Sequence, residues 1–163
     1  MNPEEMDLLS DIETRLAQWL SGHAELASVR TFEAELRPAL VGGEELTKGF
    51  PDQDLPAINL VAGLEDTASE PRSMTQSTIK VPVSIVVVVK GETRVEARRK
   101  CRGIQDALEL VLNRARRSDN QLGYNTVLVG EMRSSCAWEQ NGPHYYGLGE
   151  TKVTIQRVRE MSL

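Results

Sequence analysis

The stretch Ile79-Lys80-Val81-Pro82-Val83-Ser84-Ile85-Val86-Val87-Val88-Val89 decides the fold of this chain. Its first half alternates apolar and polar residues, which is typical of a strand with one buried face. From Val86 onward both faces are apolar, so this half has to be covered on two sides. Pro82 has no N–H to donate to a sheet ladder and favours an edge strand or a bulge. The stretch therefore predicts a long strand that needs a partner, either another element of the chain or another copy of it.

Ahead of this strand, the sequence predicts one helix and two shorter strands. Leu9, Ile12 and Leu16 repeat at helical spacing within residues 3–20, and they give the first helix one apolar stripe. Residues 29–36 and 56–62 are rich in apolar and β-branched residues and are expected to be strands. The polar, turn-rich stretch 63–77 then connects the second strand to the central one.

Behind the central strand, apolar residues step by three or four through residues 93–117 and predict a second long helix. Residues 126–136 and 152–158 follow as two strands. The order α-β-β-β-α-β-β predicts an α+β fold, with two main helices packed on one face of an antiparallel (mixed) sheet. At 163 residues the chain is most simply a single domain, 1–163, that can bury a core without metal or disulfides.

Composition and charge argue against a membrane or a nucleic acid as a binding partner. The apolar run that ends at Lys90 is too short to span a bilayer, so no membrane contact is expected. Residues 1–66 carry 14 acidic and 4 basic residues, a balance of −10, whereas residues 67–163 carry 10 acidic and 15 basic residues, a balance of +5. This asymmetry fits unevenly distributed solvated faces, or a molecule with one acidic and one basic side suited to contacts between copies. A nucleic-acid binder usually has a basic overall balance, which this chain lacks.

Residues capable of chemistry are few and scattered. His23 and His144 have no second ligand at metal-binding spacing, so no metal site is predicted. Cys101 falls on the apolar stripe of the second helix and is expected to be an inert core thiol. Cys136 is near His144 in sequence, but a nucleophile pair there lacks a third group to orient it. We therefore predict no catalytic residues, no cofactor and no enzymatic activity, and the cysteine usage suits a reducing cytosol.

The element order resembles that of the tail-terminator (minor tail, or tail completion) proteins of long-tailed bacteriophages. The resemblance is carried by the amphipathic helix at 3–20, the Leu-Pro-Ala-Ile-Asn-Leu strand at 55–60 and the polar loop after it. The Val-rich strand at 79–89, the Ala/Leu-rich helix at 97–115 and the closing pair of strands complete the pattern. It covers nearly the whole chain and is one of topology and size.

The resemblance implies a structural virion protein, assembled in the host cytoplasm and carried in the tail. It implies a homo-oligomeric ring, usually a hexamer, that caps the tail tube protein, ends tube growth and meets the head-completion or neck protein. DNA passes through the lumen of such a ring without specific binding. The implied subunit interface comprises strand residues and two arginines of the second helix: Val83, Ile85, Val86, Val87, Val88, Arg98 and Arg102. The implied contact with the tube or a neighbouring ring lies at Glu65, Asp66, Arg72 and Met74.

Two other functions fit the same sequence. One is a different neck component, such as a connector protein between head and tail, which would also form a ring. The other is a small cytosolic enzyme or adaptor that works as a monomer or dimer. The basic first half of the second helix, which includes Arg98 and Arg102, fits a solvated face as well as salt bridges to an acidic neighbouring subunit.

Overall fold

The computed structural model describes residues 3–34, 53, 55–62, 68–71, 76–117, 126–141 and 143–160. These residues contain two long helices, α1 (Pro3–Ser21) and α3 (Arg94–Arg117), and the short 3-10 helix η1 (Ala24–Leu26). They also contain the six strands of one sheet: β1 (Thr31–Ala34), β2 (Ala57–Ala62), β3 (Ala68–Pro71), β4 (Gln76–Gly91), β5 (Thr126–Asn141) and β6 (His144–Glu160).

The sheet is mixed and is organised around β4. The strand order is β1-β2-β4-β6-β5, and β3 pairs with β4 beside this path. β1 and β2 are parallel, whereas the pairs that involve β3, β4, β5 and β6 are antiparallel. β4 pairs with β6 along its whole length, from Gln76 opposite Glu160 to Gly91 opposite Tyr145. The Val-rich strand is therefore central in the sheet, with β5 at one edge and β1 at the other.

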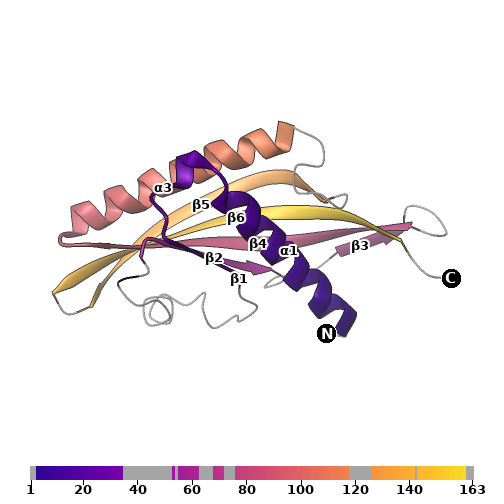
Figure 1. Cartoon of the computed structure of the whole chain (residues 1–163), viewed down its shortest axis with the longest axis horizontal. Helices are drawn as coiled ribbons and strands as arrows, with labels where there is room; N and C mark the ends of the chain where they lie inside the picture. The colour runs from indigo at the N-terminus through magenta and orange to yellow at the C-terminus, as the bar shows by residue number, and fades with distance from the viewer. Residues whose placement is uncertain are drawn as a thin grey trace.

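Both long helices lie on the same side of this sheet. Figure 1 shows α3 running roughly along the strands while α1 crosses them. The odd-numbered apolar residues of β4 pack with the apolar stripes of α1 and α3 in one buried cluster, which includes Val83, Val87, Leu16 and Leu108. Each such side chain contributes roughly 1.5–3 kcal/mol when fully buried. The helices are therefore held to the sheet by the stripes that the sequence analysis identified.

The opposite face of the sheet carries a smaller apolar cluster. Val86 and Val88 of β4 are buried there with Leu55, Ala57 and Tyr146, and Leu148 packs against them. Because the side chains of a strand alternate between faces, the run from Val86 to Val89 contributes to both clusters. This arrangement confirms that the second half of the strand is covered on two sides.

The predicted fold class is confirmed: the protein is α+β, with two main helices on one face of a mixed sheet. The expected order lacked one element, because β3 lies within the stretch 63–77 that was expected to be a connector. The last two strands are also longer than predicted, since β5 continues to Asn141 and β6 begins at His144.

The expectation of an edge strand at Pro82 is wrong for β4 as a whole, because β4 is the central strand. The pairing of β2 with β4 ends at Val83, and the pairing of β3 with β4 begins at Lys80. Pro82 lies between these two pairings, opposite only Thr154 of β6 in the described pairs. The missing N–H is therefore accommodated by an interruption of the ladder on one side of the strand.

Candidate interaction surface

The outer edge of β5 is the most open part of the described sheet. β5 pairs with β6 on one side and is last in the strand order, so its other side has no strand partner among the described residues. Residues 133–138, which read Arg-Ser-Ser-Cys-Ala-Trp, are all exposed. Within this run only Arg133 is charged and there is no proline, although charges and prolines are what usually protect an edge strand. This segment of β5 can therefore pair with a further strand.

A bulge limits how far this edge extends. Val129 lies opposite Thr154, and the next pair joins Arg133 to Lys152. Residues 130–132 of β5 therefore lie opposite a single residue of β6, and a bulge of this kind bends the strand and increases its twist. The regular edge begins at Arg133.

One flank of α3 lies directly against β5. The guanidinium of Arg94 lies over the Trp138 ring, 4.1 Å from its centroid. The Gln105 amide donates to the Ser135 carbonyl at 2.9 Å, and the Ser134 hydroxyl donates to Glu109 at 2.6 Å. These contacts hold α3, from Arg94 to Glu109, beside residues 134–138 of β5.

Arg98 and Arg102 follow Arg94 at intervals of four residues, so the three arginines form a row on this flank of α3. All three are exposed. Together with residues 133–138 of β5 they form what we call the β5 edge surface. It combines an unpaired strand edge, a half-exposed tryptophan and four arginines, the fourth being Arg133.

The five strand residues expected at a subunit interface lie elsewhere. The buried positions, each no more than 2% exposed in the single chain, are Val83, Ile85, Val86, Val87 and Val88. The helices, β2 and β6 cover the Val-rich strand, so of the two kinds of partner that the sequence allowed, elements of the same chain already shelter it. The four residues expected to contact the tube or a neighbouring ring fall outside the described residues: Glu65, Asp66, Arg72 and Met74.

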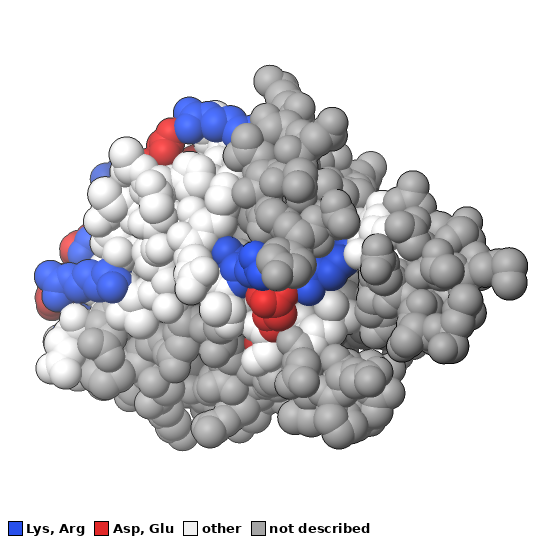
Figure 2. Space-filling view, turned by 45° about the vertical axis from the view of Figure 1, so that its right-hand side comes forward, with Lys and Arg blue, Asp and Glu red and all other residues white. Residues whose placement is uncertain are grey.

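A second surface feature is a cavity of 640 Å³ between η1, the end of β4 and the first half of α3. Its charged lining mixes signs, with four basic residues, Arg30, Lys90, Arg99 and Lys100, and three acidic ones, Glu25, Glu92 and Glu96. The mixed lining therefore gives no clear indication of the charge of a ligand. Figure 2 shows basic and acidic side chains close together on the described part of one face of the molecule.

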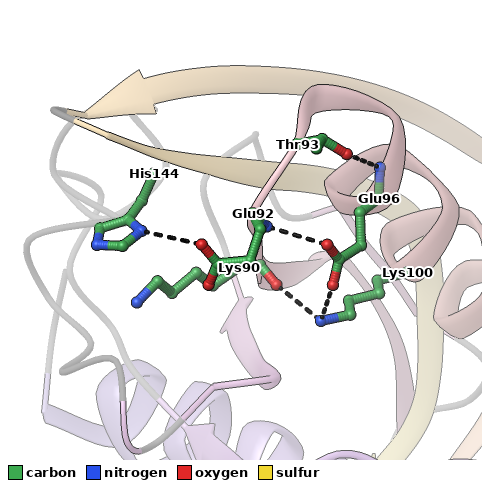
Figure 3. A network of polar contacts seen from close by, with 6 residues as sticks. All are labelled: Lys90, Glu92, Thr93, Glu96, Lys100 and His144. Carbon is green, nitrogen blue, oxygen red and sulfur yellow. Dashed lines mark hydrogen bonds and ion pairs between the residues drawn. The ribbon is translucent and has the colours of Figure 1, made fainter.

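Several of these charged groups hold the start of α3 in place (Figure 3). The Thr93 hydroxyl accepts the Glu96 N–H at 3.1 Å, and Glu96 accepts the Glu92 N–H at 3.1 Å. Lys100 donates to the Lys90 carbonyl at 3.2 Å and pairs with Glu96 at 2.9 Å. The hydrogen bond from Lys100, followed by that from Glu92, keeps the pKa of Glu96 below its ordinary value. The cluster therefore serves as a helix cap, and the Thr-x-x-Glu spacing in the sequence is the signal for it.

The histidines have structural contacts. The His23 Nδ1–H donates to the Trp19 carbonyl at 2.8 Å, and the two rings meet edge to face. The His144 Nδ1 lies 3.9 Å from a Glu92 carboxylate oxygen (Figure 3). The described residues contain no group of three or more His, Cys, Asp or Glu side chains that could hold a metal ion.

Cys136 and His144 are not brought together. Cys136 lies opposite Gly149 and His144 lies opposite Asn141, which places them five positions apart along the ladder, or roughly 17 Å. The Cys136 sulfur instead lies 3.5 Å from the Cys101 sulfur. These two residues therefore do not form a Cys–His nucleophile pair.

Glu13 is a buried polar residue that the sequence analysis did not single out. It is 1% exposed, and its carboxylate accepts the Ala62 N–H at 2.8 Å, which satisfies the end of β2. Glu13 follows Leu9 by four residues and Ile12 by one, so the helical spacing alone places it near the buried stripe.

No described helix is both long and apolar enough to cross a membrane.

In fold, the chain is similar to a chain in a solved structure described as the virion of a native gene transfer agent particle. The two chains share 15% sequence identity with a TM-score of 0.49, and the match covers 89% of this chain and 94% of that chain. No model of a known protein family matches the sequence, and neither does any curated protein.

Proposed function

We propose that this chain is a structural virion protein that forms a ring with copies of itself and caps the tail tube of a phage. The observation that carries the proposal is the β5 edge surface. An exposed run of strand with one charge and no proline is an aggregation hazard unless a defined partner pairs with it. A second copy of the chain is such a partner, because β-strand addition gains main-chain hydrogen bonds at each contact.

Charge supports a head-to-tail contact between copies. The β5 edge surface carries Arg94, Arg98, Arg102 and Arg133, with Glu109 beside Ser134 as an acidic neighbour, whereas residues 1–66, which include α1, β1 and β2, have 14 acidic and 4 basic residues. β1 is at the edge of the sheet opposite β5. A basic edge that meets an acidic edge is attractive, whereas two basic edges repel each other. Such a contact uses different surfaces on the two copies, and it closes into a ring when the rotation between copies allows it.

The resemblance in element order supports the proposal that this ring lies at the end of the tail tube. A tail terminator ends the polymerisation of the tube protein and offers its other surface to the head-completion or neck protein. In this proposal the ring is a hexamer, DNA passes through it without specific binding, and the stretch from Glu65 to Met74 meets the tube or the adjoining ring. The buried valines of β4 support the contact indirectly, by fixing the sheet whose edge is used. No step of the proposal requires catalysis.

The first test is the oligomeric mass of the purified chain, measured by size-exclusion chromatography with light scattering. The native chain is expected to give a single closed oligomer. Ser135→Lys places a charge on the open edge and should weaken association by roughly tenfold or more. Leu110→Lys adds the same charge at an exposed position of α3, outside both the β5 edge surface and the acidic residues 1–66, and is the matched control, with no change expected. A native chain that stays monomeric at high concentration would overturn the ring.

Salt dependence tests the role of the arginine row. Reversing the charge in Arg98→Glu together with Arg102→Glu should weaken association more at low salt than at high salt, because exposed charges are screened over about 8 Å at physiological ionic strength. An effect that does not change with salt would assign these side chains to solvent.

Capping is tested by adding the purified chain to polymerising tube protein from the same phage and measuring tube length by electron microscopy. Terminators should shorten the tubes and appear at one end only. Binding to the head side of particles, with tube length unchanged, would replace the terminator with a connector of head and tail.

A further inference from the structure

The two cysteines of the chain meet between α3 and β5. Their sulfur atoms are 3.5 Å apart, both are free thiols, and the sequence contains no other cysteine. Cys101 is fully buried on the inner face of α3, whereas Cys136 is exposed on β5. A buried thiol in contact with an accessible one, from segments 35 residues apart, is an arrangement that the proposed assembly does not explain.

Two glycines of β6 create the space for this contact. Gly149 lies opposite Cys136, and a Cβ at Gly149 would come within 2.9 Å of the Cys101 sulfur and 2.4 Å of the Gln105 amide nitrogen. A Cβ at Gly147 would come within 2.7 Å of the Ala97 carbonyl oxygen and 2.9 Å of the Cys101 Cβ. The glycines therefore let α3 approach the sheet closely enough for Cys101 to reach the strand beyond β6.

We propose that Cys101 and Cys136 form an intramolecular disulfide by exchange with a small disulfide such as oxidised glutathione, and that this bond fastens α3 to β5. A disulfide requires the sulfur atoms to close to about 2.05 Å, so α3 and β5 have to shift by only a small amount. The inference concerns the chain itself and holds whether or not the chain forms a ring.

The exposed thiol reacts first. The Cys136 thiolate attacks one sulfur of oxidised glutathione, which breaks the S–S bond, releases one glutathione thiolate and leaves a mixed disulfide on Cys136. The Cys101 sulfur then attacks the Cys136 sulfur and displaces the second glutathione thiolate, which takes up the proton that Cys101 loses. Two protein thiols are oxidised and one glutathione disulfide is reduced to two thiols, which take up the two protons.

The burial of Cys101 explains why the exposed Cys136 reacts first. Desolvation, followed by the neighbouring Cys136, raises the pKa of the Cys101 thiol far above its ordinary value. Because Cys101 is buried and its sulfur lies 3.5 Å from the Cys136 sulfur, it is shielded from reagents and attacks only a disulfide that is already beside it. The exposed Cys136 is the point of entry, and Cys101 is the resolving thiol.

The bond should change stability and the behaviour of the edge strand. It closes a loop of 35 residues, and in the chain-entropy description a loop of this size should raise Tm by roughly 10 °C. It should also slow the exchange of the backbone amides of residues 133–138, because β5 is then fixed to α3 as well as to β6.

The test treats the full chain with oxidised glutathione at mildly alkaline pH and follows mass, free thiols and Tm. The expected product is a chain that is not covalently linked to another, has lost two hydrogens, has no thiol reactive with a maleimide when unfolded, melts roughly 10 °C higher and reverts with reductant. Cys136→Ser should show no change of mass or Tm. Cys101→Ala should stop at the stable glutathione adduct of Cys136.

Other products would overturn the proposal. A lasting glutathione adduct on the native chain would show that Cys101 does not reach Cys136 in solution. A covalent dimer would show that Cys136 pairs with another copy rather than with Cys101. Because Cys136→Ser leaves the buried cysteine in place, the result remains interpretable if Cys101→Ala proves unstable.

Discussion

β4 and β5 are strands of equal length, 16 residues each, in the same sheet, yet they have opposite surroundings. β4 is paired on both sides over most of its length and buried on both faces where it is most apolar. β5 is paired on one side, and its residues 133–138 are exposed. The most apolar strand is thus satisfied within the chain, and a stretch of β5 that is mostly small and polar, residues 133–137, is left open. In this molecule hydrophobicity marks the core, and an unpaired backbone marks the surface that we propose for contacts between copies.

The largest expected effect comes from placing the same charge in the two strands. Val87→Asp puts a carboxylate among the helices and Val88→Asp puts one on the opposite face, and each should cost more than about 4 kcal/mol and prevent folding. Ala137→Asp at the exposed edge of β5 should change stability by less than about 0.5 kcal/mol. Circular dichroism shows whether each variant folds, and urea unfolding measures its loss of stability relative to the native chain. Comparable losses at Val88 and Ala137 would mean that the second face of β4 is wet.

A smaller effect should come from Glu13, the buried acid that completes β2 beside β4. Glu13→Ala leaves the Ala62 N–H without this acceptor and should cost about 1–3 kcal/mol in the free energy of unfolding. Glu13→Gln retains a carbonyl oxygen of similar reach and should cost clearly less. If the two variants lost equal stability in urea titrations, the hydrogen bond would not be the reason that Glu13 is buried.

The smallest effect concerns β6, the strand that separates β4 from β5. Asp11 of α1 accepts from Arg15 at 2.9 Å and pairs with Arg157 of β6 at 2.7 Å. Burial acts to raise the pKa of Asp11, but hydrogen bonds from Arg15 and Arg157 outweigh it and hold this pKa below its ordinary value. The resulting stability is present above the unfolded pKa of about 3.9 and is lost as the pH falls through the folded pKa.

Asp11→Asn should therefore destabilise the chain by about 0.5 kcal/mol at neutral pH, a small amount because the Asp11 side chain is 40% exposed and solvent screens the pair. The difference in the free energy of unfolding between the native chain and the variant should vanish in strong acid. Unfolding curves collected across the acid range provide the measurement, and a difference independent of pH would point to packing rather than charge.

Periodicity predicted the helices and β4 because their apolar residues repeat over many positions. It failed where pairing rather than side-chain pattern decides the structure. β3, with the sequence Ala-Ser-Glu-Pro, has no apolar alternation and forms a strand through its backbone pairing with β4. Arg98 and Arg102 were singled out for their charge, but their place beside the edge of β5 depends on how α3 packs on the sheet. The contact of Cys101 with Cys136 depends on Gly147 and Gly149, whose role appears only when three elements are assembled.

The bulge in β5 sets a limit on any strand that joins the sheet. From Arg133 to Asn141 the regular edge spans nine residues, roughly 30 Å, and it stops where residues 130–132 leave the ladder. An incoming strand that slid further would lose its hydrogen bonds at that point. In a closed assembly the bulge would fix the register of the added strand, so that each copy pairs with its neighbour at the same position along β5.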